Sequence, residues 1–223
     1  MSARGVRCTA RRAAAIARSI ARRGLVGVLV AALASPLAAQ AQQWRTSSDT
    51  GGIQLESRTL PGERFDQLRA STRVAVAPQV VADFLVGDYL DQENKNIRRT
   101  FVKRTPKLTI WSDVLTAPAI DARCYSMRFE RSEPAADGQV TVRFSTGEYI
   151  GPRPSDCIAL RAHGEWSLRP VGNGTLIAYT SLTDIGGGTP AILVRGRLSS
   201  AAVSSVRKVA AGALKLHAQR SHR

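Results

Sequence analysis

The sequence "HGEWSLRPVGNGTLIAYTSLTDIGGGTPAILV", residues 163–194, decides the fold. Apolar and polar residues alternate in both halves of it, which is typical of two strands that each bury one face. The short glycine-rich turn at residues 172–174 predicts that these strands are antiparallel neighbours. Asp184 ends the second strand, three glycines follow, and residues from Pro190 to about His217 are predicted to form one long helix.

The alternation also indicates how the sheet is covered. One face of residues 157–170 carries Ile158, Leu160, Ala162, Gly164, Trp166 and Leu168, and the other carries Arg161, His163 and Glu165. One face of the sheet is therefore wet and the other is covered. The terminal helix is the only large element available to cover it. We predict an α+β, helix-grip architecture, in which a curved antiparallel sheet wraps around a long C-terminal helix.

The remaining elements fit this architecture. A helix is predicted from Pro78 to about residue 89, after two strands at 52–60 and 68–76. A polar stretch over 91–99 follows the helix. The other strands are predicted at residues 100–104, 108–115, 123–131, 139–149, 157–169 and 175–183, in a simple meander. The inner stripe of the last helix is expected to contain Val203, Val206, Val209, Ala210, Ala213 and Leu214.

Residues 1–41 are predicted to be a signal peptide. They carry seven arginines and no acidic residue, an apolar run from Leu25 to Ala34, and the small-residue site Ala39-Gln40-Ala41. Ten apolar residues are too few for a membrane anchor, which needs about 20. We expect cleavage near Ala41 and export to the periplasm or the medium, with Arg22-Arg23 as a weak twin-arginine signal. The predicted domains are this signal, a mature N-terminal segment at 42–51, a ligand-binding domain at 52–217 and a disordered basic tail at 218–223.

The formal charge of +15 falls to +8 once residues 1–41 are removed. Outside the cytoplasm we expect no nucleic-acid partner. Scattered cations attract anionic lipid headgroups or polysaccharide, so transient contact with an anionic membrane is one interpretation of this charge. A solvated basic surface on a monomer is the other interpretation, and we slightly favour it.

The opening stretch resembles the closing segment of the START domain, a lipid-transfer family of the helix-grip, Bet v 1-like superfamily. The matching residues are Gly164, Trp166, Thr175, Ile177, Tyr179, Asp184, Gly186, Gly187, Pro190, Ala191 and Val194. Ile185 replaces a usual proline, and Arg195 stands where asparagine is common. Upstream, Pro118, Asp121 and Arg123 fit the family's pattern loosely. The resemblance covers roughly residues 52–213.

This resemblance implies a hydrophobic, lipid-like ligand held between the sheet and the last helix. Access would pass two gate loops, which contain Pro118, Asp121, Gly186, Gly187 and Gly188. The side chains that we expect to face the cavity are Trp111, Tyr125, Met127, Leu160, Trp166, Ile177, Tyr179, Ile192, Leu193 and Leu198. No catalytic residue, metal or cofactor is predicted.

Two alternatives stay open. A cavity enzyme of the cyclase or hydratase type would use buried acids or bases, for which Asp113, Tyr125 and Tyr179 are candidates. Asp113 shares the parity of Trp111, although we favour a surface position for it. An interaction domain with a filled core would lack a ligand pocket, whose volume is roughly 300–1,000 Å³.

The glycine run is interpreted as a hinge. It lacks the lysine of a phosphate-binding loop, and Pro190 removes one N–H donor. We expect Thr189 to cap the last helix and Pro190 to occupy its first turn. His163 is interpreted as solvated, because no second metal ligand lies at a recognisable spacing.

Cys124 and Cys157 are not expected to form a disulfide. In a simple meander they lie two strands apart, about 9.6 Å. A disulfide needs Cα atoms within roughly 7 Å, so the pair would bond only if the sheet pinches at that end.

Overall fold

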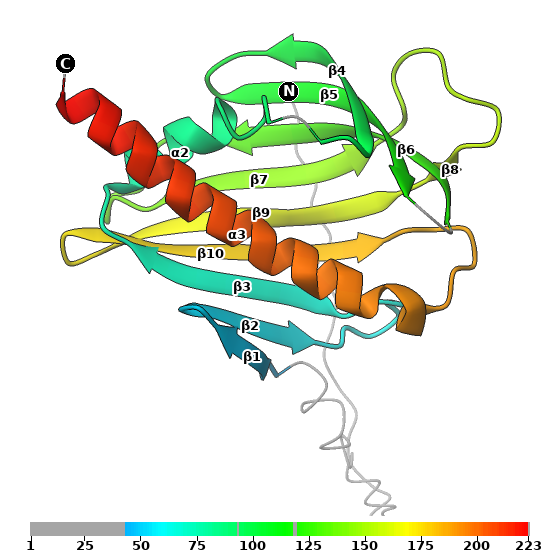
Figure 1. Cartoon of the computed structure of the whole chain (residues 1–223), viewed down its shortest axis with the longest axis horizontal. Coiled ribbons are helices and arrows are strands. Elements are labelled where there is room, and N and C mark those ends of the chain that lie inside the picture. The colour runs from blue at the N-terminus through cyan, green and yellow to red at the C-terminus, as the bar shows by residue number, and fades with distance from the viewer. Residues whose placement is uncertain (1–42, 93, 118–119, 223) are drawn as a thin grey trace, which may run out of the picture. The chain divides into compact units, whose positions relative to one another are not determined.

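The computed structural model describes residues 43–222 except 93, 118 and 119. One antiparallel sheet carries a long helix across one face (Figure 1). Its strands are β1 (Arg45–Thr50), β2 (Ile53–Arg58), β3 (Gln67–Val74), β4 (Ile97–Arg104), β5 (Leu108–Ala117), β6 (Ile120–Arg131), β7 (Val140–Gly147), β8 (Ile158–Ala159), β9 (Arg161–Val171) and β10 (Gly174–Asp184), and the helices are α2 (Pro78–Val86) and α3 (Ala191–Ser221).

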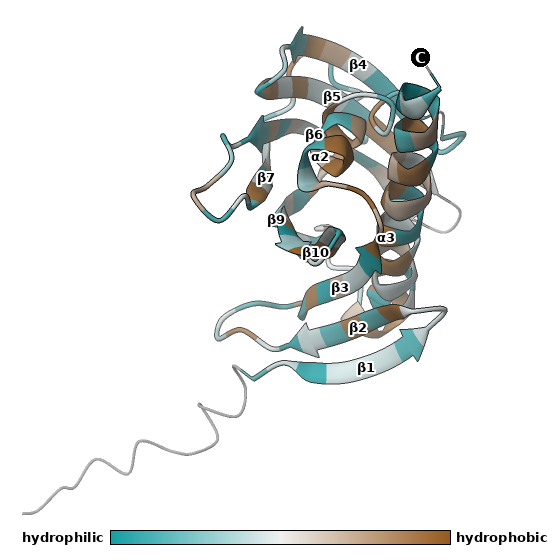
Figure 2. Cartoon of the chain, turned by 90° about the vertical axis from the view of Figure 1, so that its left-hand side faces the viewer, coloured by the Kyte–Doolittle hydropathy of each residue, from teal (hydrophilic) through white to brown (hydrophobic). Residues whose placement is uncertain are grey.

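The strand order is β1-β2-β3-β10-β9-β7-β6-β5-β4. Strands β4 to β7, β9 and β10 form the predicted meander. Strand β3, from earlier in the chain, pairs with the remaining edge of β10. The sheet curves, and both helices lie on its concave side (Figure 2). This is the α+β architecture predicted from the alternating strands and the terminal helix.

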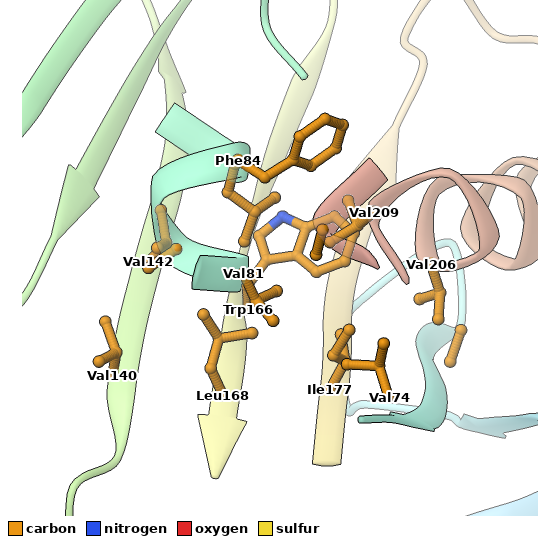
Figure 3. Packing of buried hydrophobic residues seen from close by; sticks show 14 of the residues in the cluster. Val74, Val81, Phe84, Val140, Val142, Trp166, Leu168, Ile177, Val206 and Val209 are labelled. Atoms are coloured by element: carbon orange, nitrogen blue, oxygen red, sulfur yellow. The ribbon is translucent and has the colours of Figure 1, made fainter. Parts of the chain in front are cut away.

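The aliphatic core lies where α3 crosses the sheet. Val206, Val209 and Ala213 are fully buried, as predicted. They belong to the same core cluster as Leu168 and Ile177 of the sheet, some of which Figure 3 shows together. Phe84 of α2 packs so closely on α3 that a Cβ atom at Gly212 would lie 2.0 Å from its ring.

Several boundaries differ from the prediction. The sheet begins at Arg45, before the predicted domain start at Gly52, and β1 is polar throughout. α3 continues to Ser221 through residues predicted to form a disordered tail. Leu214 is 46% exposed and does not join the inner stripe. The predicted signal peptide lies outside the described residues.

Cys124 and Cys157 form a disulfide with a Cα–Cα distance of 5.7 Å, so the prediction that they stay apart was wrong. The reason lies in the register. β7 ends opposite Ser126 of β6, which leaves the first part of β6 without that neighbour. The two-residue strand β8 takes the vacant place and pairs with Arg123 and Cys124 in parallel. The cysteines therefore lie on neighbouring segments.

Candidate functional site

A hollow of about 130 Å³ lies on the concave face toward the β4 end of the sheet. Its wall is mainly aromatic, with one ion pair. The lining residues are Tyr89, Leu90, Arg99, Trp111, Asp113, Tyr125, Met127, Phe129, Phe144, Trp166 and Tyr179. They come from six neighbouring strands and from the segment that follows α2. Residues of α3 do not contribute to this wall.

Strand register brings the polar residues of the hollow together. Arg99 of β4 lies opposite Asp113 of β5, and Asp113 lies opposite Tyr125 of β6. Asp113 has the parity of Trp111, so its side chain points to the concave face and is completely buried. The favoured interpretation of Asp113 as a surface residue was therefore wrong.

The Asp113 carboxylate accepts four hydrogen bonds. The Nε and Nη2 atoms of Arg99 donate to it over 2.9 and 2.8 Å. Trp111 Nε1 donates over 2.9 Å and the Tyr125 hydroxyl over 3.0 Å. Three of these bonds reach Oδ2 and one reaches Oδ1, so four protein donors already occupy a carboxylate that has about four acceptor sites in all. The charge of Asp113 is compensated, and the carboxylate is poorly available as a general base.

Burial sets the protonation of the tyrosines. Burial raises the pKa of Tyr125 far above its ordinary value, and the negative charge of Asp113 raises it further. Burial also raises the pKa of Tyr179, to about 12. Burial opposes the charge of Arg99, but the hydrogen bond and attraction to Asp113 outweigh it and raise its pKa. At neutral pH the hollow therefore contains neutral phenols and one compensated ion pair.

Five of the ten predicted cavity residues line this hollow: Trp111, Tyr125, Met127, Trp166 and Tyr179. Leu198 lines a smaller hollow of about 60 Å³ beneath α3, which shares Tyr179 with the first. Leu160 packs in a separate apolar cluster with Ile185 and Val194. Ile177 is fully buried in the main core.

Ile192 and Leu193 do not face a cavity, because they are 77% and 66% exposed. The buried side of α3 follows Val194, Ala202, Val206, Val209 and Ala213, at spacings of three, four or eight residues. Such spacings keep one helix face. Ile192 and Leu193 point away from it.

Sequence reasoning missed several lining residues: Tyr89, Leu90, Arg99, Phe129 and Phe144. Arg99 matters most, because it neutralises Asp113. It belongs to a stretch predicted to be a polar connection, yet β4 already begins at Ile97. Arg99, Phe101 and Lys103 occupy every second position and so share one face of a possible strand. This was the available signal, but it is weak because two of the three residues are charged.

The two predicted gate loops are connected by Arg123, which is only 1% exposed. Its guanidinium donates to the carbonyl oxygens of Asp121 and Ile185 and to Thr189 Oγ1 over 3.3 Å. Thr189 therefore does not cap α3, whose N-cap is Pro190 without a side-chain hydrogen bond. Pro118 lies outside the described residues.

The glycine hinge has a backbone that favours glycine. Gly186, Gly187 and Gly188 have φ values of 66°, 65° and 65°, a left-handed conformation that is costly for other residues. A Cβ atom at Gly186 would also lie 2.6 Å from the Ala159 carbonyl oxygen. The sharp strand-to-helix turn thus packs directly on β8.

The hollow is smaller than a typical ligand pocket of roughly 300–1,000 Å³, and the hollow beneath α3 is smaller still. A larger, open groove of about 550 Å³ shares Leu90 and Arg99 with the first hollow. Among residues 43–222, as far as they are described, no group of three or more metal-ligating side chains occurs. No helix of that part is long and apolar enough to cross a membrane.

No protein-family model matches the sequence, and no curated protein is recognisably similar to it. Solved structures do match. A STAR-related lipid transfer protein from Xanthomonas axonopodis (fragment 25–204) aligns with a TM-score of 0.66 and 22% identity, over 76% of this chain and 98% of that chain. Human StAR-related lipid transfer protein 5 aligns with a TM-score of 0.64 and 15% identity, over 78% and 88%. The chain therefore has the START-like fold, a large antiparallel sheet with a long C-terminal helix packed on it.

Proposed function

We propose that the protein binds a hydrophobic ligand in the hollow lined by Trp111, Tyr125 and Tyr179. The observation that carries this proposal is the aromatic wall around a fully compensated Arg99–Asp113 pair. Binding sites for small molecules are mostly apolar, with a few polar groups that fix orientation. The START-like fold supports the same conclusion, because similar folds occur in proteins named for lipid transfer.

The ligand that fits the hollow directly has one ring and one hydroxyl group. A dry apolar cavity of about 150 Å³ accommodates benzene, and this hollow measures about 130 Å³. The Tyr125 oxygen donates its hydrogen to Asp113 and keeps lone pairs that a ligand hydroxyl can use. A longer ligand would extend past Leu90 toward the open groove, because this residue lines both spaces.

Binding is favoured over catalysis. Asp113 and Tyr125 do meet in the hollow, as a cavity enzyme would require. The carboxylate is nevertheless held by four donors and paired with Arg99, and the pKa of Tyr125 is raised far above neutrality. The Tyr125 hydroxyl therefore does not readily give up its proton, and the Asp113 carboxylate is engaged with Arg99. Carriage or sensing of an unreacted ligand follows from this arrangement.

We place this binding outside the cytoplasm. The basic, apolar and small-residue order of residues 1–41 supports export, and the Cys124–Cys157 disulfide supports an oxidising compartment. Expression in a bacterial host followed by intact-mass analysis tests this. We expect a periplasmic product that begins near Gln42; an unprocessed chain retained in the cytoplasm contradicts the assignment.

Native mass spectrometry of the purified protein, followed by solvent extraction, tests the binding itself. We expect a co-purified hydrophobic molecule, or uptake from a panel of alkylphenols, sterols, fatty acids and phospholipids. A protein that carries nothing and takes up none of these compounds refutes the proposal.

A further inference from the structure

The outer face of α3 has an unusual charge. Its 31 residues include Arg195, Arg197, Arg207, Lys208, Lys215 and Arg220, but neither aspartate nor glutamate. Two of these cations are paired, Arg195 with Asp66 at 3.7 Å and Arg220 with Asp83 at 2.7 Å. Within the described part of the chain, the other four make no ion pair.

These four cations share one side of the helix. At 3.6 residues per turn, Arg197, Arg207, Lys208 and Lys215 all lie in the half opposite the buried stripe. All four are exposed. In Figure 1 this side of α3 faces the viewer, and no other element lies in front of it.

Exposed apolar side chains accompany these cations: Leu193 and Leu214 lie on the same half, and Ile192 lies at its edge. Ile192 and Leu193 are 77% and 66% exposed, more than any other large hydrophobic residue that the structure describes, and Leu214 is 46% exposed. Ile192 and Leu193 occupy the first turn of α3, with Arg195 and Arg197 one turn away. Adjacent aliphatic residues at such exposure favour a partner that removes them from water.

We propose that this face of α3 docks on an anionic lipid bilayer. The stretch from Ile192 to Lys215 spans roughly 35 Å at 1.5 Å per residue. A straight helix of that length presents its cations in a row, which matches a flat anionic surface. The exposed aliphatic pair enters the boundary between headgroups and acyl chains, as in helices that lie on membranes. This inference does not depend on the ligand-binding proposal.

Co-sedimentation with vesicles tests it. The full chain is mixed with vesicles of phosphatidylcholine and phosphatidylglycerol (3:1) or of phosphatidylcholine alone. All variants keep residues 1–41, so that these seven arginines contribute equally. The test variant replaces Arg197, Arg207, Lys208 and Lys215 by Gln. The matched control replaces four exposed cations on strands, Arg73, Arg98, Lys103 and Arg169, by Gln.

Each cation near an anionic membrane contributes about a fivefold change in binding. We therefore expect the partition of the α3 variant onto anionic vesicles to be at least about tenfold weaker than that of the wild type. The control variant should change the same partition less than about threefold. The double variant I192S/L193S should also bind more weakly. Equal losses in both charge variants overturn the proposal, because the attraction is then diffuse. The proposal is also overturned if the wild-type protein does not bind anionic vesicles. The cationic face would then be better explained by an acidic protein partner. As a control for the ligand site, the α3 variants should bind p-cresol, a small alkylphenol that fits the hollow, as well as the wild type does. The vesicle result then does not depend on ligand binding in the hollow.

Discussion

The two halves of the concave face differ in packing and in charge. One half, at β2, β3 and β10, lies under α3 and is filled by Ile177, Val206 and Val209. The other half, centred on β4 to β6, lies beyond α3 and contains Asp113 with the hollow, whose wall continues across β7 and β9 to Tyr179 of β10. The same sheet therefore provides a packed support on one side and an aromatic pocket with a buried charge on the other. Stability and binding are expected to respond to different residues.

The largest effect is expected from Asp113→Ala. The substitution leaves the Arg99 guanidinium and the Tyr125 hydroxyl without their buried partner, which costs about 3–5 kcal/mol of unfolding free energy. Chemical denaturation measures it. Glu133→Ala is the control, because its ion pair with Lys107 is exposed, and it should leave the midpoint unchanged. A stable Asp113→Ala protein would show that the pair is structurally dispensable.

Truncation should separate the two halves. Ile177→Ala creates a cavity in the packed half and should cost about 2–5 kcal/mol. Met127→Ala enlarges a hollow that already exists, so the loss should be smaller by at least about 1 kcal/mol. Equal losses in the same denaturation assay would mean that the hollow is as tightly packed as the core.

Two glycines of α3 provide a sharper test of the packed half. Alanine normally stabilises a helix by about 1 kcal/mol relative to glycine. Gly196 has open space around it, so Gly196→Ala should stabilise the protein by up to that amount. Gly212→Ala should instead destabilise it by about 1–2 kcal/mol, because overpacking against Phe84 exceeds the helix gain. If both variants were stabilised, the close contact of α2 with α3 would be wrong.

The smallest effect concerns pH at the hinge. Burial alone would raise the pKa of Asp184, but hydrogen bonds from the Gly186 backbone and from Arg161 lower it below 3.8. A lowered pKa means that the stabilisation is complete above 3.8 and is lost as pH falls through the folded value. Asp184→Asn should thus be less stable than wild type at pH 6, and the gap should close toward pH 3. A gap independent of pH would exclude this contribution.

The packed half could be predicted from sequence, and much of the pocket could not. Strong alternation around Trp166 and Ile177 fixes both strands, and the spacing of Val206, Val209 and Ala213 fixes the inner side of α3. Arg99 lies in a polar stretch whose register with β5 depends on distant pairing. The direction of Asp113 follows from that register, as does the disulfide, which depends on the early end of β7. Local pattern carries no information on such pairings.

Calorimetric titration of p-cresol tests the central claim most directly, because this probe has one ring and one hydroxyl group. Two variants carry the same added side chain on opposite faces: Met127→Trp fills the hollow, and Leu176→Trp lies in a groove away from it. We predict binding to wild type and to Leu176→Trp with similar Kd, and at least tenfold weaker binding to Met127→Trp, a loss of about 1.4 kcal/mol. Equal binding to all three proteins, or none to wild type, would contradict the assignment of the hollow as a ligand site.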